Sequence, residues 1–352
     1  LLAIGGEKSE KTQVDAFLDA LHWSKWALTT DGPITFQLGK GYYTDRVVQM
    51  LSTLIDSLAS QIEVHLQVDA QQLQICLPDL GRDAPRRLEQ LRSRDATRLT
   101  PLAETVQAEI GDPCFQWVRT LTGTTCSGRV DGLEVCQLDE NGQGRISIGQ
   151  IGRTGRQSPA RARFRELAGT DEFRFDGSTR SEAVDLIKKL VQDRRRGKLS
   201  EYELEHLLEA RVLREAVAVE TRGNRLKPLL TQFPAIWSEG GDTKYVDVVM
   251  QADGVPWVVE LKVPEGGGQG QYCRHAVGQA VLYREFIRRA VGLHPWFRER
   301  DLEPSRCQAA VAFPLRGSET QRETALNQVR YLAELFNIHV VVLSDEWKAP
   351  DR

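Results

Sequence analysis

The sequence of 352 residues predicts an α/β protein, with a central mixed sheet flanked by helices in its C-terminal part and an α+β domain before it. Three observations predict this class. Strand-like and helix-like apolar periodicities alternate after about residue 200. The dipeptide Asp253-Gly254, which favours two-residue type I′ turns, joins two of the expected strands into a hairpin. The apolar run 340–343 has no polar alternation, which is typical of a strand covered on both faces.

The C-terminal part is expected to contain a helix, three strands and then two helix–strand units. The expected elements are a helix over about 200–219, a strand near 235–238, hairpin strands at 244–249 and 257–263, a helix over about 272–291, a strand at 308–313, a helix over about 318–336 and a strand at 338–343. This order is αβββαβ with one further αβ unit. It predicts a mixed sheet, because a crossover helix joins parallel strands. We expect these elements to form one domain over 200–352.

The N-terminal region, about 1–165, is expected to form an accessory α+β domain that serves substrate recognition or regulation. Its expected elements are a strand at 34–38, a helix over 45–60, a hairpin through 62–77, helices near 82–94 and 102–110, and a second hairpin that pairs 133–138 with 145–151. Residues 166–199 form a basic linker or helical connection in this division.

The composition is that of an ordinary soluble protein, with 41% hydrophobic residues and a formal charge of −3. This charge gives no overall attraction to nucleic acid, so any such binding depends on local basic surfaces. No stretch reaches the roughly 20 apolar residues of a membrane-spanning helix, and a cytoplasmic location is expected. The six cysteines include no C-x-x-C pair, which argues against a structural zinc site.

Three clusters of basic residues are candidates for phosphate contacts. They are Arg153, Arg156, Arg161, Arg163 and Arg165; Lys188, Lys189, Arg194, Arg195, Arg196 and Lys198; and Arg284, Arg288 and Arg289. A charge run is also typical of a solvated face, and this interpretation has equal weight for the first cluster. The second and third clusters lie closer in sequence to the elements that carry the candidate site.

The expected hairpin places two carboxylates opposite one another. Counting outward from the turn, Ala252 faces Val255 and Asp247 faces Glu260. In this register the two acidic residues form a non-hydrogen-bonded pair, whose Cβ atoms lie roughly 4.5–5.5 Å apart. Two like charges at this separation are unfavourable unless a cation lies between them.

A hard divalent cation such as Mg²⁺ or Mn²⁺ suits this pair of oxygen ligands. Lys262 lies two residues beyond Glu260, so its side chain leaves the same face of the strand. The pattern therefore predicts a metal site with an amine beside it. Carboxylates more than about 7 Å apart could not share one ion, which makes their separation a structural test.

The pattern Asp247…Glu260-x-Lys262 resembles the catalytic hairpin of the PD-(D/E)xK nuclease superfamily, which includes restriction endonucleases, Holliday-junction resolvases and RecB-like nucleases. Val246 replaces the proline of the motif's name, a departure that the superfamily often shows. The resemblance covers only the C-terminal region. It implies a restriction-endonuclease-like αβββαβ core with a central mixed sheet flanked by helices.

Two further segments carry the resemblance. Residues 200–209 resemble the first helix of resolvase-like members, in which Glu201 matches an additional metal ligand. Helical periodicity places Glu201 in the apolar stripe of that segment, with Glu205 and Glu209 at its edge as alternatives. A glutamate that only favours the helix dipole would explain Glu201 about as well. Gln279 and Tyr283 share a helix face and match the Gln-x-x-x-Tyr feature of the RecB-like branch.

The resemblance implies a metal-dependent nuclease that hydrolyses phosphodiester bonds, with DNA as the expected partner, in repair, restriction or defence. Asp247, Glu260, the Leu261 carbonyl and Glu201 would hold Mg²⁺ or Mn²⁺, while Lys262 would orient or deprotonate the attacking water. The expected substrate and supporting contacts are Gln279, Tyr283, Arg284 and Arg288. No membrane partner is expected, and a homodimer is compatible with this function.

Three alternatives stay open. The first is a catalytically silent nucleic-acid-binding or regulatory module on the same fold, although clustered carboxylates have no use in binding a polyanion. The second is a nuclease that acts on RNA, since the sequence has no aromatic stacking motif that would decide between the two nucleic acids. The third is an unrelated α/β protein in which Glu260 and Lys262 are ordinary strand residues.

Overall fold

The computed structural model describes most of the chain. The described residues are 2–4, 10–23, 34–38, 44–58, 63–68, 71–73, 77, 88–89, 91–92, 100–119, 125–148, 159–196, 204–221, 223–235, 244–263, 269–344 and 347. By their contacts, they form two compact units, one within 1–85 and 212–348 and the other within 86–211. Within the described ranges, no helix has the length and apolar character that a membrane crossing requires.

A five-stranded mixed sheet forms the centre of the first unit. Its strands are β12 (Lys227–Ala235), β13 (Lys244–Ala252), β14 (Val255–Leu261), β15 (Gln308–Pro314) and β16 (His339–Leu343), in that spatial order. β12, β13 and β14 are antiparallel, and β14, β15 and β16 are parallel. The expected mixed sheet is therefore confirmed.

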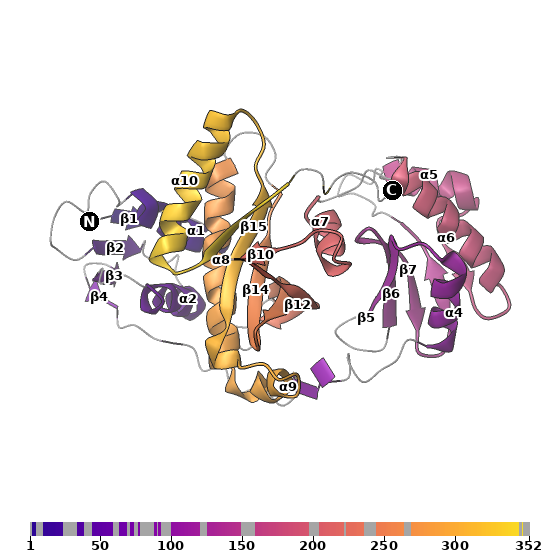
Figure 1. The fold of residues 1–352 in the computed structure, drawn as a ribbon, viewed down its shortest axis with the longest axis horizontal. Coiled ribbons are helices and arrows are strands. Elements are labelled where there is room, and N and C mark those ends of the chain that lie inside the picture. Colours follow the sequence, from indigo (N-terminus) through magenta and orange to yellow (C-terminus); the bar gives the residue numbers. More distant parts are fainter. Residues whose placement is uncertain are drawn as a thin grey trace. The chain divides into compact units, whose positions relative to one another are not determined.

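Two long helices connect the parallel strands and cover one face of this sheet. They are α8 (Gln269–Arg289) and α10 (Glu319–Leu335), which lie side by side (Figure 1). α10 begins at Ser318, whose side chain forms a capping box with Gln321. The short elements η2 (Val291–Leu293), α9 (His294–Arg298) and η3 (Pro304–Arg306) lead from α8 to β15. Phe233 of β12 packs against Phe286 of α8 and Trp296 of α9.

The two edge strands depart from the sequence expectation. β12 begins at Lys227, well before the expected strand at 235–238, and its prolines Pro228 and Pro234 hide the strand signal. Proline is tolerated there because an edge strand leaves one row of N–H groups without a ladder partner. β16 has the expected position, but Val342 is 50% exposed, so the prediction that this strand is covered on both faces is wrong. Val341 and Leu343 are buried, whereas Val340 and Val342, on the other face, are half-buried and exposed.

A smaller sheet precedes the central one in sequence. It consists of β1 (Leu2–Ile4), β2 (Ile34–Leu38), β3 (Val64–Val68) and β4 (Gln71–Gln72), with the first three parallel. Helices α1 (Glu10–Trp23) and α2 (Asp45–Asp56) contact α8, so they lie between the two sheets (Figure 1). The predicted strand 34–38, the helix from Asp45 and the antiparallel β3–β4 pair are confirmed.

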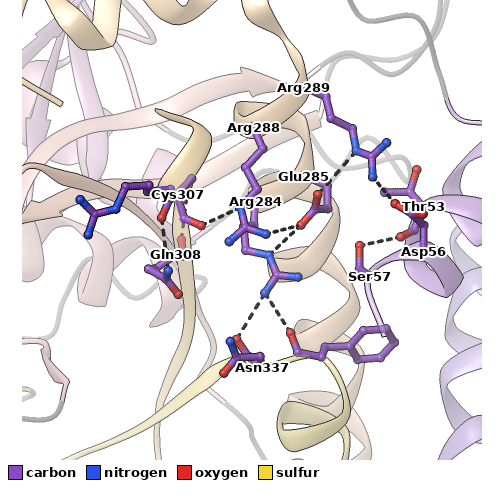
Figure 2. Close-up of polar contacts among 12 residues, drawn as sticks. Thr53, Asp56, Ser57, Arg284, Glu285, Arg288, Arg289, Cys307, Gln308 and Asn337 are labelled. Atoms are coloured by element: carbon purple, nitrogen blue, oxygen red, sulfur yellow. Dashed lines mark hydrogen bonds and ion pairs between the residues drawn. The ribbon is translucent and has the colours of Figure 1, made fainter. Parts of the chain in front are cut away.

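Ion pairs fix α1 and α2 to opposite ends of α8. Arg274, near the start of α8, donates to Asp19 of α1 at 2.6 Å. Arg289, at the end of α8, forms an ion pair with Asp56 of α2 (Figure 2). The contacts therefore group the first 85 residues with the C-terminal part, whereas the sequence suggested a separate domain over 1–165.

The second unit has its own antiparallel sheet and core. Its strands β5 (Phe115–Arg119), β6 (Thr125–Val130), β7 (Leu133–Asp139), β8 (Gly144–Ile146) and β9 (Phe173–Phe175) follow one another in space. Helices α4 (Pro101–Ile110), α5 (Pro159–Ala168) and α6 (Arg180–Arg195) contribute Val106, Phe164 and Leu190 to the core beneath them. The expected helix at 102–110 and the β7–β8 hairpin are confirmed.

The helix expected over 200–219 is shorter than predicted. α7 spans Leu204–Leu213, and Glu215 takes a left-handed backbone conformation with φ 58° just beyond its end. A two-stranded hairpin of β10 (Glu220–Thr221) and β11 (Asn224–Arg225) follows before β12 begins. The left-handed residue ends the helix, since continued helix requires negative φ.

Candidate functional site

The β13–β14 hairpin has the register that its turn predicts. Asp253 and Gly254 have φ of 52° and 70°, as a type I′ turn requires at both central positions. The Cα pairs run from Ala252 and Val255 to Val248 and Val259. The ladder ends there, and Asp247 and Glu260 are the next residue of each strand.

Three oxygen atoms converge on the ammonium group of Lys262. Its Nζ lies 2.7 Å from Glu260 Oε1 and 3.8 Å from Asp247 Oδ2, and it donates to the Leu261 carbonyl at 3.1 Å. The Leu261 N–H in turn donates to Asp247 Oδ2 at 2.9 Å, which holds this carboxylate against β14. The sequence expectation that these side chains share one face of the hairpin is therefore confirmed.

The separation of the two carboxylates satisfies the limit set by a shared ion. Both oxygens lie near one nitrogen, so their distance cannot exceed the sum of 2.7 and 3.8 Å, which is below about 7 Å. Within the described ranges, no three His, Cys, Asp or Glu side chains lie close enough to hold a metal ion. A cation here would therefore use Asp247, Glu260 and the Leu261 carbonyl, together with water and substrate oxygens. Glu201 lies outside the described residues.

Burial decides from which side this group of atoms is accessible. The Glu260 and Lys262 side chains are 2% and 10% exposed, whereas that of Asp247 is 30% exposed. The backbone N–H of Lys262 donates to Ala312 O of β15 at 3.0 Å, which fixes the lysine at the end of the parallel ladder. Charges at this depth are stable only when they are paired. The accessible side is the one on which Asp247 lies.

Helix α8 contributes a buried tyrosine to the surroundings of the site. Burial raises the pKa of Tyr283, and the negative charges of Glu260 and Asp247 raise it further, while Lys262 opposes them. The hydroxyl is therefore protonated at neutral pH and can act as a hydrogen-bond donor. Gln279, one turn earlier on the same helix face, is half-buried.

A second tyrosine of α8 was not anticipated from the sequence. The Lys262 ammonium lies 6.0 Å from the centre of the Tyr272 ring, and Tyr272 is 41% exposed. Tyr272 precedes Gln279 by seven residues and Tyr283 by eleven, which places all three on one stripe of the helix. This spacing is the signal in the sequence that could have identified it.

Two arginines expected to contact substrate have structural partners instead (Figure 2). The Arg284 side chain is 4% exposed and donates to the carbonyls of Phe336 and Asn337 at 2.9 and 3.3 Å. Burial lowers the pKa of Arg284 from its ordinary value. Arg288 donates to the Cys307 carbonyl at 2.9 Å and to Glu285 at 3.0 Å. These contacts do not support the expectation that either arginine binds substrate.

The position of these arginines along the strands explains why they do not reach the candidate site. Trp257 pairs with Gln308 at the start of β15, next to Cys307, whereas Glu260 pairs with Val311. Three residues along a strand correspond to roughly 10 Å. Arg288 therefore binds the opposite end of the parallel strands from the one at which the carboxylates and Lys262 lie.

Arginines of the first basic cluster are occupied by ion pairs within the second unit. Arg163 of α5 bridges to Asp193 of α6, and Arg161 and Arg165 both pair with Asp171. Arg153 and Arg156 lie outside the described residues. In the second cluster, Lys188, Lys189, Arg195 and Arg196 are exposed, and Arg195 pairs with Asp112 at 3.0 Å.

Comparison with known protein families, with curated proteins and with solved structures finds no match for this chain.

Proposed function

We propose that the chain is a metal-dependent nuclease of the PD-(D/E)xK type that hydrolyses phosphodiester bonds, with DNA as its substrate. The resemblance of Asp247, Glu260 and Lys262 to the catalytic hairpin supports this function. Antiparallel β12–β14, followed by α8 and by β15 parallel to β14, are consistent with the βββαβ part of a restriction-endonuclease-like core. This function requires no contribution from Arg284 or Arg288.

The convergence of three oxygens on one ammonium carries the proposal. Glu260 Oε1, the Leu261 carbonyl and Asp247 Oδ2 lie within 3.8 Å of Lys262 Nζ and come from two strands and one backbone position. Such an arrangement stabilises positive charge, and its hard oxygen ligands suit Mg²⁺ or Mn²⁺. An ordinary surface salt bridge would be more exposed, and it would not include two neighbouring carboxylates.

The bound divalent ion would acidify a water molecule and neutralise charge on the scissile phosphate. Asp247 and Glu260 hold the ligand oxygens in place, and the Leu261 amide prevents Asp247 from turning away. The Lys262 ammonium lies beside the same oxygens and would orient the attacking water. It could act as the base only after losing its own proton.

A cleavage assay with single substitutions tests the proposal. Asp247→Asn and Lys262→Met are incubated with single-stranded, duplex and branched DNA and with RNA, in Mg²⁺, Mn²⁺ or EDTA. Cleavage by the wild type should require the metal, and each variant should lose roughly 10²–10⁴-fold in rate, since general acid–base groups contribute about this much. Asp253→Asn is the matched control, because it changes a carboxylate of the same hairpin at a position where asparagine suits the turn.

The outcomes separate the proposal from its alternatives. A wild-type protein that cuts no nucleic acid, or variants that cut as fast as the control, would refute the nuclease. Preferential cleavage of RNA would keep the site and change the substrate. Binding of DNA without cleavage, unaffected by Asp247→Asn, would indicate a silent binding module.

A further inference from the structure

We propose that Tyr272 and Tyr245 form a pair of aromatic contacts that receive unpaired bases on either side of the phosphate to be cleaved. The substrate class is therefore a single-stranded, frayed or flipped nucleotide and not a fully stacked duplex. This inference rests on the proposed nuclease function and specifies its substrate.

Exposure distinguishes these two tyrosines from the rest of the site. Tyr272 and Tyr245 are both 41% exposed, whereas Tyr283 is only 5% exposed. Within the described residues, six large apolar or aromatic side chains are exposed, and the two tyrosines among them both flank the candidate site. Single exposed apolar side chains are common on proteins, so it is the position of these two rings beside Asp247 and Lys262 that favours a ligand with an apolar face.

The position of Tyr272 follows from the Lys262 contact. The ring centre lies 6.0 Å from Nζ, within the range of a cation–π interaction. Because Lys262 also contacts Glu260 Oε1, a phosphate at this centre would bring its own nucleotide next to the Tyr272 ring.

Tyr245 lies on β13, near Asp247. It lies two residues before Asp247 on β13, so both side chains leave the same face of the strand, about 7 Å apart. Asp247 is the more accessible of the two carboxylates, and Tyr245 is next to it on the solvent side. The two rings thus come from different elements, α8 and β13, and both lie near Lys262 or Asp247.

The chemistry of stacking determines the substrate. In a duplex, neighbouring base pairs cover both faces of each base, so no face is free for a protein ring. A base that stacks on tyrosine must be unpaired, and every base offers such a face, which makes the contact tolerant of sequence. A ring at the cleavage centre therefore selects nucleic acid by structure and not by sequence.

The test measures binding separately from cleavage. Full-length wild type, Tyr272→Ala, Tyr272→Leu, Tyr272→Phe and Tyr245→Ala are titrated in EDTA against a labelled 12-nucleotide strand and against a hairpin duplex of the same sequence. Tyr272→Ala and Tyr272→Leu should weaken binding of the single strand roughly 5- to 100-fold and leave duplex binding within about twofold. Tyr272→Phe, which keeps the ring, should bind like the wild type.

An abasic scan of the strand makes the assignment specific. Removing the base at one position next to the cleaved linkage should lower the affinity of the strand as much as Tyr272→Ala does. Combining the abasic strand with this variant should cause no further loss. Equal loss on single strand and duplex, or full additivity with every abasic position, would overturn the stacking proposal. If the wild type cleaves both substrates in Mg²⁺ with equal efficiency, the nuclease stands and the proposed substrate preference is wrong. A wild type that neither binds nor cleaves refutes the nuclease itself.

Discussion

At the scale of single residues, Lys262 is the group on which the candidate site depends. Its ammonium is the cation nearest to Glu260, which is almost completely buried, and it also lies near Asp247. Removing one partner of a buried ion pair costs more than the pair contributes, because an uncompensated charge is left behind. Lys262 therefore has a structural role in the metal-free protein, in addition to its proposed catalytic role.

We expect Lys262→Met to lower the free energy of unfolding by roughly 3–5 kcal/mol in EDTA, because Glu260 loses its nearest cation. Mn²⁺ should restore part of this loss, since an ion that binds only the folded state stabilises it. Urea unfolding with and without Mn²⁺ measures both effects. The double variant Lys262→Met with Glu260→Gln should lose less stability than the single variant. Equal unfolding midpoints for the wild type and Lys262→Met would contradict this account.

Tyr283 offers a test of the site that needs no activity. Burial and then the charges of Glu260 and Asp247 raise its pKa, so its hydroxyl should stay protonated through pH 10, near which ordinary tyrosines titrate. The absorbance change at 295 nm between pH 7 and pH 10 should then be the same for the wild type and Tyr283→Phe. A smaller change in the variant would show that the tyrosine is not in this environment.

The positions of the hairpin residues could be predicted from the sequence, but the partners of the arginines could not, for a physical reason. The register of the hairpin follows from a two-residue turn, so Asp247, Glu260 and Lys262 could be located by counting. The direction of Arg284 depends on which groups pack around α8, and its partners Phe336 and Asn337 are some fifty residues away in sequence. No local pattern carries that information.

At the scale of elements, α1 and α8 are joined by hydrogen bonds at one point and by close packing of Leu18 on Gly278 at another. Asp19 accepts hydrogen bonds from Arg274 and Gln271, and His275 Nε2 lies 3.0 Å from it. A Cβ atom added to Gly278 would lie 2.4 Å from Leu18 Cδ1, so the helices approach closely there. The two contacts fix both the position and the rotation of α1 on the helix that carries Tyr283.

Asp19→Asn should lower the free energy of unfolding at pH 7 by roughly 1.5–3 kcal/mol, the usual contribution of a hydrogen bond to a charged group. Burial raises the pKa of Asp19, but the hydrogen bonds from His275 and Arg274 together lower it well below its ordinary value. A lowered pKa in the folded state stabilises the protein above the unfolded pKa of about 3.9, and this stability is lost as the pH falls. The difference between wild type and variant should therefore shrink below pH 4.

The matched control for this measurement is Asp56→Asn, at the other end of α8. Asp56 pairs with Arg289 but its side chain is 45% exposed, against 23% for Asp19, so a smaller loss is expected. Equal losses for the two variants, or a loss for Asp19→Asn that is independent of pH, would argue against the charged network.

The edge strands show where element prediction reached its limit. β13, β14 and β15 lie inside the sheet and were predicted within a few residues, because buried strands need uninterrupted apolar and β-branched residues. β12 lies at one edge and tolerates two prolines, which weaken its pattern. β16 lies at the other edge and exposes Val342, although its sequence is as apolar as that of a covered strand.

At the scale of the whole molecule, the grouping of segments could not be predicted from sequence order. Residues 1–85 and 212–348 belong to one unit although a second unit lies between them in the chain. The grouping results from the packing of α1 and α2 on α8, and such long-range contacts have no local signature. The expectation of a separate accessory domain rested on the predicted helices and strands of that region and on the C-terminal position of the motifs.

This grouping predicts how fragments of the chain should behave. Residues 86–211 have their own sheet and hydrophobic core and should fold alone, with a single cooperative thermal transition. Residues 212–348 alone should not, because they lose α1 and α2, and Arg274, which is 3% exposed in the whole chain, loses its partner Asp19. Circular dichroism and thermal unfolding of the two fragments measure the difference.

A further experiment supplies the missing segment, residues 1–85, as a separate chain. Co-expression of residues 1–85 with 212–348 should restore a cooperative transition, and Asp19→Asn in the short fragment should weaken this complementation, since Asp19 supplies the ion pair to α8. If 212–348 alone unfolds cooperatively, at the same midpoint as in the full chain, the first 85 residues are dispensable for the sheet that carries Asp247, Glu260 and Lys262. The candidate site would then belong to an independent domain, and the packing of α1 and α2 would be only an attachment.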